Sequence, residues 1–192
     1  MTIDRALSIP GFMLPAELAY IAGLAQRRCS TLGSIIVELG SWRGRSAVAW
    51  AENSAAMVYC VDTWADHAFG DAHFPDDPPD LHDHPNWLLN EFHRNTRGLA
   101  SIIAMRMTTT EAAQVFAAEG LRADVVFVDA GHLEHEVAAD IEAWRPLLKE
   151  DGILCGHDYG FEGWPAVETV VRRMIPKFRV IETIWTTEME SE

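Results

Sequence analysis

The chain has 192 residues, of which 48% are hydrophobic and 23% charged, and this length and balance predict one globular domain over residues 1–192. Its 15 basic and 29 acidic residues give a formal net charge of −14, which repels nucleic-acid phosphates and anionic membranes and favours a small-molecule partner. The three cysteines are widely spaced and form no CxxC pair, so neither a disulfide framework nor a zinc knuckle is indicated.

No segment combines the basic residues, apolar run and small-residue cleavage site of a secretory signal, and none approaches the roughly 18 apolar residues of a membrane span. We therefore expect a cytoplasmic protein whose thiols are reduced and buried. Apolar residues among the first 20 positions could serve a dimer contact, which leaves a homo-oligomer open.

The first predicted element is a cap helix at about residues 13–28, because apolar residues recur at helical spacing after Pro15. Nearly all-apolar strand candidates follow at residues 34–39, 57–64, 100–105, 123–130 and 152–159. Amphipathic helix candidates separate or follow them at residues 46–56, 109–120, 134–148 and 164–175. This alternation indicates a doubly wound α/β fold, with a mostly parallel sheet covered by helices on both faces. Residues 178–189 predict one strand or a tight pair.

Residues 64–87 break the alternation. They contain four prolines, several histidines and many aspartates, without a helical or strand pattern. An irregular stretch of this length inside a domain predicts a mobile, acidic lid over the ligand site. The "HDH" at residues 82–84 lacks the spacing of a metal site, so we favour the lid.

A glycine-containing turn follows the first predicted strand, which ends in Glu38 before Gly40 and Gly44. Such a turn places backbone free of side chains at the carboxyl edge of the sheet, where ligands bind in open α/β folds. The pattern is E-x-G-x-x-x-G and not G-x-G-x-x-G. Trp42 and Arg43 would crowd a pyrophosphate at this position, which disfavours a dinucleotide.

Asp62 closes the second strand 22 residues after Gly40, close to the interval of about 20 residues at which an acid meets a ribose diol. Ribose without pyrophosphate indicates an adenosyl ligand. Glu38 suits the ammonium of an amino-acid tail on that ligand. These features together favour S-adenosylmethionine as the cofactor.

Acids and histidines also follow two later strands, as Asp129 with His132, and His157 with Asp158. Since neighbouring strands lie about 4.8 Å apart, Asp129 and Asp158 could share one ion such as Mg²⁺. His157 could be a third ligand if the ion is a transition metal. A neutral His132 could take the proton of a substrate hydroxyl whose acidity the metal raises, which predicts O-methylation.

The segments "VELGSWRGRSA", "VYCVDTW", "VFVDAGH" and "AWRPLLKEDGILCGHDY" resemble the motifs of class I S-adenosylmethionine-dependent methyltransferases, through to about residue 170. The resemblance implies the Rossmann-like fold of that class. It also implies that Asp62 holds the cofactor ribose, and that Trp64 walls the adenine while Met107 and Thr108 contact it. The methionine portion would be held by Glu38, Gly40, Ser41 and Gly44.

Within that superfamily, "VDAGH…GHDY" is most similar to a branch with macrocin-type sugar O-methyltransferases and cephalosporin-hydroxylase-like proteins. Metal-dependent members carry an acid after the fourth strand, a histidine base three residues later and an acidic pair after the fifth strand. Asp129, His132 and Asp158 match this pattern, whereas His157 replaces the first acid of the pair. The usual "DADHSYE" reads "DAGHLEH" here, with changes at Gly131, Glu134 and His135.

The sequence therefore predicts a methyltransferase that acts on a small-molecule hydroxyl, with divalent-metal assistance left open. One alternative is a metal-dependent hydrolase or oxygenase that uses the cluster of Asp129, His132, His157 and Asp158. A second alternative is a non-catalytic protein that binds an adenosyl ligand. A dehydrogenase that uses NAD is disfavoured by the glycine spacing.

Overall fold

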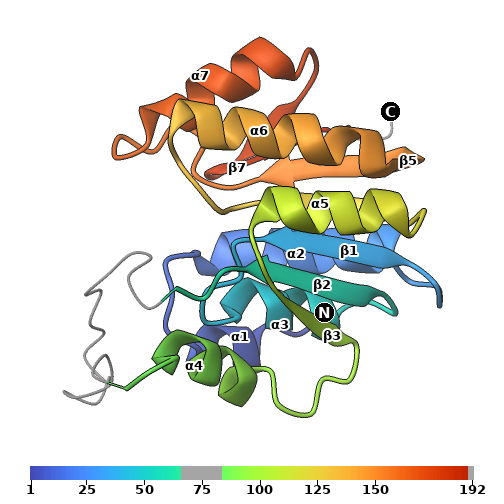
Figure 1. Cartoon of the computed structure of the whole chain (residues 1–192), viewed down its shortest axis with the longest axis vertical. Helices are drawn as coiled ribbons and strands as arrows, with labels where there is room; N and C mark the ends of the chain where they lie inside the picture. The colour runs from blue at the N-terminus through green and yellow to red at the C-terminus, as the bar shows by residue number, and fades with distance from the viewer. Residues whose placement is uncertain (66–83, 190–192) are drawn as a thin grey trace.

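The computed structural model of the protein describes residues 1–65 and 84–189. Its centre is a seven-stranded sheet in the order β3-β2-β1-β4-β5-β7-β6, with helices on both faces (Figure 1). The strands are β1 Ile35–Leu39, β2 Met57–Asp62, β3 Ile102–Arg106, β4 Ala123–Val128, β5 Leu148–Gly156, β6 Arg179–Ile181 and β7 Ile184–Thr186. The first five strands are parallel to one another, and β7 runs antiparallel to both β5 and β6. The predicted doubly wound α/β fold is confirmed.

Helices cover both faces of this sheet and bury two apolar cores. They are α1 Asp4–Ser8, α2 Pro15–Arg28, α3 Arg45–Glu52, α4 Trp87–Asn95, α5 Thr109–Ala118, α6 Glu134–Trp144 and α7 Pro165–Met174, with a 3₁₀ turn at Arg145–Leu147. One core lies beneath α1 to α4 and contains Trp50 and Phe92, and the other lies beneath α5 to α7 and contains Phe116 and Trp144. No helix among the described residues is long and apolar enough to cross a membrane.

Several elements end earlier than the sequence indicates, for identifiable reasons. The helix predicted at 134–148 stops at Trp144, because Pro146 has no N–H for the helical hydrogen bond and its ring crowds the preceding turn. The strand predicted at 57–64 stops at Asp62, where the chain turns sharply and Trp64 adopts a positive φ of 43°. The cap helix predicted at 13–28 is α2, which begins with Pro15 in its first turn.

Two regions were open or unassigned in the sequence. The C-terminal tail forms a tight pair of strands, β6 and β7. Helix α4 was not predicted, although Trp87, Leu88 and Phe92 are buried on one side of it. Most of the lid predicted at 64–87 lies outside the described residues.

Gly40 joins the ends of three strands. Its N–H donates to the carbonyl of Val61 at 2.8 Å, while the N–H of Asp129 donates to the carbonyl of Leu39 at 2.9 Å. Gly40 has a φ of +85°, and a Cβ there would collide with the carbonyl oxygen of Asp129. Glycine is therefore required twice, for the left-handed backbone and for the close approach of the two strand ends.

We predict that Gly40→Ala destabilises the fold by about 2–5 kcal/mol, because left-handed strain and a collision with backbone add together. Gly98 is a matched control, since its φ is also +85° but a Cβ there meets nothing within 4 Å. Gly98→Ala should cost only the conformational part, about 1–2 kcal/mol. Urea unfolding of both variants measures the difference in their free energy of unfolding. Equal losses would contradict the prediction, because they would show that the backbone near Gly40 moves to make room for the methyl group.

Candidate functional site

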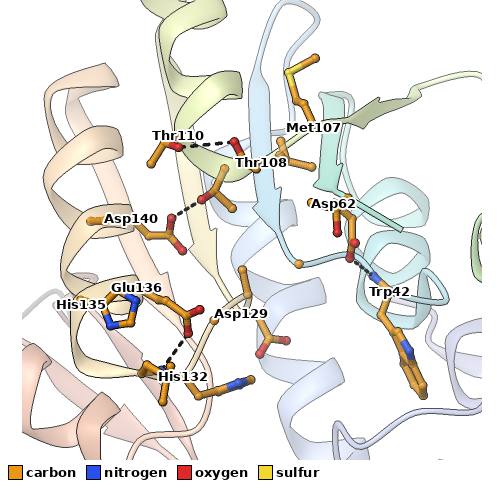
Figure 2. A pocket seen from close by; sticks show the side chains of 18 of the residues that line it. Trp42, Asp62, Met107, Thr108, Thr110, Asp129, His132, His135, Glu136 and Asp140 are labelled. Atoms are coloured by element: carbon orange, nitrogen blue, oxygen red, sulfur yellow. Dashed lines mark hydrogen bonds between the residues drawn. The ribbon is translucent and has the colours of Figure 1, made fainter. Parts of the chain in front are cut away.

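A cavity of about 600 Å³ opens at the carboxyl ends of the central strands. Figure 2 shows Asp62 and Trp42 on one side of it, Glu136 and Asp140 on the opposite side, and Asp129 between them. Ligands bind at this edge in open α/β folds, and the strand order reverses between β1 and β4 here. The lining residues are Gly40, Trp42, Val61, Asp62, Thr63, Leu88, Met107, Thr108, Thr109, Thr110, Asp129, Ala130, Gly131, His132, Leu133, His135, Glu136, Ala139, Asp140 and Trp164.

Asp62 is held rigidly at the end of β2. Its Oδ2 accepts a hydrogen bond from the Trp42 N–H at 2.9 Å, and its Oδ1 accepts one from the Trp64 N–H at 2.7 Å. Burial raises the pKa of Asp62, although these backbone donors oppose the shift. The carboxylate thus has a fixed orientation at the cavity wall, which suits it to accept hydrogen bonds from a diol.

Glu38 and Ser41 lie behind the glycine turn and do not line the cavity. Glu38 is fully buried, and neither of its carboxylate oxygens has a hydrogen-bond partner among the described residues. The Ser41 hydroxyl is likewise buried without a partner in this part of the chain. Burial raises the pKa of Glu38 to about 7, against the influence of the nearby Ser41 and Ser46 hydroxyls. Orphaned buried groups of this kind are expected where a ligand or water completes the hydrogen bonding.

Gly44 and Trp64, two further predicted cofactor residues, do not reach the cavity. A Cβ on Gly44 would lie 3.0 Å from a methyl of Thr96 and 3.1 Å from the ring of Phe92, so this glycine allows α3 to pack closely on α4. Trp64 is fully buried against Phe92, with ring centroids 4.7 Å apart, and its Nε1–H donates to the Trp42 carbonyl. The alternative of a core role, rather than an adenine wall, fits this placement of Trp64.

Met107 and Thr108 line the cavity between β3 and α5. Thr108 is the N-cap of α5, and its hydroxyl accepts a hydrogen bond from the Glu111 N–H. The neighbouring Thr109 hydroxyl donates to Asp140 on α6 (Figure 2). This loop is therefore fixed at both of its flanks beside the cavity.

His132 and Asp158 form a hydrogen-bonded pair at the cavity edge. His132 Nε2 lies 2.7 Å from Asp158 Oδ2, and the imidazole stacks on Trp164 with ring centroids 4.6 Å apart. Asp158 has a φ of +62°, a left-handed conformation that aspartate tolerates better than most residues. The pKa of Asp158 is lowered, because the two histidines outweigh the effect of its burial.

His157 lies among three carboxylates. Its Nδ1 is 3.2 Å from Asp158 Oδ1 and 3.5 Å from Asp129 Oδ1, and its Nε2 is 3.2 Å from Glu17 Oε2. Burial alone would lower the pKa of His157, but these carboxylates outweigh it and raise the pKa to about 12. At neutral pH His157 is therefore an imidazolium cation that compensates the buried acids.

The group of side chains that could hold a metal ion contains His132, whereas the sequence predicted His157 together with the same two aspartates. Ligand atoms of Asp129, His132 and Asp158 all lie within 4.8 Å of one another. His157 was predicted as a ligand together with both aspartates, but each of its ring nitrogens faces a carboxylate instead. A protonated imidazole has no lone pair to give to a metal.

Glu17 was missed by the sequence analysis. It lies in the first turn of α2, accepts hydrogen bonds from the Leu14 N–H at 2.7 Å and the Thr183 hydroxyl at 2.5 Å, and contacts His157. Burial raises its pKa, but the partners outweigh this effect and lower the pKa to about 2. The sequence showed only an acid in the first turn of a helix, a common capping position.

Asp140 was also missed. It is buried on α6, and its pKa is raised to about 6 by burial, against the hydrogen bond from Thr109. A signal was present in the sequence, since Asp140 falls on the same helix face as Val137, Ile141 and Trp144, all of which are buried. An acid within an apolar helix stripe marks a site candidate.

The chain is similar in sequence to a known protein family and to one curated protein. A profile of the family described as methyltransferase domain matches residues 37–159. Uncharacterized protein y4gI of Sinorhizobium fredii (strain NBRC 101917 / NGR234) is 30% identical over 139 residues, which make up 67% of this chain and 14% of that protein. The chain thus spans a small part of the length of this relative.

Solved structures share the fold at low sequence identity. An O-methyltransferase from Bacillus cereus in complex with SAH has a TM-score of 0.67 at 14% identity, over 96% of this chain and 86% of that chain. CalS11, a calicheamicin methyltransferase, has a TM-score of 0.61 at 14% identity, over 90% and 79% of the two chains. An rRNA methylase from Streptococcus thermophilus has a TM-score of 0.57 at 14% identity, over 92% and 97%. The fold is therefore common to enzymes with very different acceptors.

We predict that Glu17→Gln destabilises the protein by about 1–3 kcal/mol at neutral pH, because His157 and Thr183 lose a charged partner. The folded pKa of Glu17 is about 2, below its ordinary 4.5, so its contribution is fully present above about pH 4.5 and is lost as the pH falls toward 2. Urea unfolding at pH 3 and pH 7 measures this. A stability gap between wild type and variant that does not narrow at pH 3 would contradict it. Glu142→Gln, on the exposed face of α6, is the control.

Proposed function

Because the chain belongs to the methyltransferase domain family, we propose that it transfers the methyl group of S-adenosylmethionine to the hydroxyl oxygen of a small molecule. The observation that carries this proposal is the single cavity lined by Asp62, by Gly40 of the glycine turn and by His132, which pairs with Asp158 behind it. The family match also favours this reaction over the hydrolase, oxygenase and dehydrogenase alternatives. A small acceptor agrees with the net charge of −14, which disfavours RNA.

The residues present fit this cofactor. Asp62 would accept hydrogen bonds from the ribose hydroxyls, Gly40 leaves room for close approach, and Met107 and Thr108 would contact the adenine. The orphaned carboxyl of Glu38 and the hydroxyl of Ser41 would support the methionine portion from behind the turn. When bound, S-adenosylmethionine supplies an electrophilic methyl carbon on a positively charged sulfur.

His132 is our candidate general base. In its neutral form, an Nε2–H that donates to Asp158 leaves Nδ1 as the basic nitrogen of the ring. The Asp158 carboxylate stabilises the imidazolium that forms when His132 accepts the proton of the acceptor hydroxyl. Stacking on Trp164 fixes the plane of the ring. Asp129, between His132 and the glycine turn, would orient the acceptor hydroxyl.

The same residues support a second candidate mechanism, in which a divalent ion assists the reaction. Asp129, His132 and Asp158 offer one imidazole and two carboxylates, a donor set that suits Mn²⁺ or Fe²⁺ better than Mg²⁺. Such an ion would lower the pKa of the acceptor hydroxyl. His132 would then be a ligand and not the base, so turnover in excess EDTA separates the two mechanisms.

We predict that Asp62→Ala weakens binding of S-adenosylmethionine and S-adenosylhomocysteine at least 100-fold, because a buried acceptor for two hydroxyl donors is lost. Calorimetric titration of metal-stripped protein measures this, with Asp151→Ala, an exposed acid outside the cavity, as the control. Wild-type protein that binds neither ligand, with or without Mn²⁺, would refute the proposed cofactor.

We predict that His132→Gln retains cofactor binding but loses about 10²–10⁴-fold in kcat, the usual contribution of a positioned general base. Mass spectrometry of products from a panel of hydroxyl compounds provides the assay. Full activity of the variant on a wild-type substrate would exclude His132 as the base. Absence of turnover by the wild type across the panel would favour the non-catalytic alternative.

A further inference from the structure

Apart from the imidazoles of His132 and His135, the ionisable side chains that line the cavity are all acids. Its described lining contains four carboxylic acids and no lysine or arginine. The acids are Asp62, Asp129, Glu136 and Asp140. An anionic ligand would therefore find no lysine or arginine on the described lining, whose basic side chains are the imidazoles of His132 and His135.

The bound cofactor accounts for only part of this negative charge. Asp62 is assigned to its ribose, whereas Asp129, Glu136 and Asp140 follow the wall formed by the end of β4 and by α6 (Figure 2). Glu136 Oε2 accepts a hydrogen bond from the Leu133 N–H at 3.0 Å, and Asp140 accepts one from the Thr109 hydroxyl. These donors are neutral, so they orient the two carboxylates without cancelling their charge.

The imidazolium of His157 does not reverse the sign. It contacts Asp129, but it is shared with Asp158 and with Glu17, so that one positive charge faces three negative ones. Before the positively charged sulfur of the cofactor is bound, the surplus charge of the described lining is therefore negative.

Two indole rings complete the cavity wall. Trp42 and Trp164 both line it, and each already has a partner. Phe12 stacks on Trp42 with ring centroids 5.4 Å apart, the Arg43 guanidinium lies 4.9 Å from the Trp42 ring centroid, and His132 stacks on Trp164. Aromatic faces bind flat or cyclic molecules and attract ammonium groups. The acids of the lining are therefore the main feature that would recognise a cationic ring compound, with the Trp164 indole beside them.

We propose that the acceptor is a hydroxylated ring compound that carries a protonated amine and no phosphate, sulfate or carboxylate. This inference rests on the proposed function. The acceptor proposed for this chain differs in charge from the substrate named for CalS11, which is described as a TDP-rhamnose 3'-O-methyltransferase. A nucleotide sugar would bring a pyrophosphate next to Asp129 and Glu136, with no lysine or arginine on the described lining to receive it.

The first test measures the charge preference at the methyl position. Sinefungin carries an amine where S-adenosylmethionine carries the methyl group, whereas S-adenosylhomocysteine is uncharged there. We expect sinefungin to bind at least tenfold more tightly by calorimetry at pH 7, a difference of about 1.4 kcal/mol. Asp129→Asn should reduce this ratio at least threefold, and Glu142→Gln, on the exposed face of α6, should leave it unchanged. Equal affinities in the wild type would overturn the inference.

The second test uses acceptors in matched sets. Tyramine, 4-ethylphenol and 4-hydroxyphenylacetate form one set, and glucosamine, glucose and glucuronate form another. In each set, the inference is supported if the hydroxyl of the amine-bearing compound is methylated at least tenfold faster than the hydroxyl of the carboxylate-bearing compound. The reverse order overturns the inference. If no member is methylated, the sinefungin ratio decides. Failure of the proposed function is distinct, because sinefungin and S-adenosylhomocysteine would then both fail to bind.

Discussion

The close approach of Gly40 to the backbone of Asp129 is the constraint on which the rest of the site depends. No side chain fits between them, so the turn after β1 lies directly against the end of β4. The hydrogen bond from Gly40 to Val61 draws the end of β2 to the same place. Asp62 and Asp129 are far apart in the sequence, yet this contact brings both to the lining of one cavity. A ligand bound there is in reach of both strand ends.

The sequence was sufficient for the parallel sheet, because each central strand is a short, mostly apolar run that ends in a polar residue or glycine or is followed directly by one. It was insufficient where tertiary contacts decide the ends of elements. Strand β2 stops at Asp62 because this side chain accepts two N–H groups from the turns beyond it, one of them from Trp42. Helix α4 is held by the contact of Phe92 with Trp64, which no local pattern encodes. The pair formed by β6 and β7 depends on the antiparallel pairing of β7 with β5.

The candidate site was predictable to the extent that sheet topology determines it. Parallel strands carry their final residues to one edge, so Asp62, Asp129 and Asp158 could be grouped from the strand order alone. Contacts that helices make across the fold could not be predicted in this way. Glu17 reaches His157 from α2, and nothing in the spacing of the chain relates an acid near the N-terminus to the end of β5. The place of Trp64 in the core likewise depends on α4.

His157 explains how this edge tolerates so many buried acids. A carboxylate that leaves water needs a compensating charge, and without one it would take up a proton. In the pattern that the sequence resembles, an acid stands at the position of His157. That acid adds a further negative charge, which a bound cation would have to compensate. Here a histidine stands there, contacts Glu17, Asp129 and Asp158, and supplies a cation from within the chain. The Asp158 carboxylate is thereby kept ionised, in the state that can accept a hydrogen bond from His132 and stabilise its protonated form. Compensation within the protein and activation of the candidate base thus depend on the same side chain.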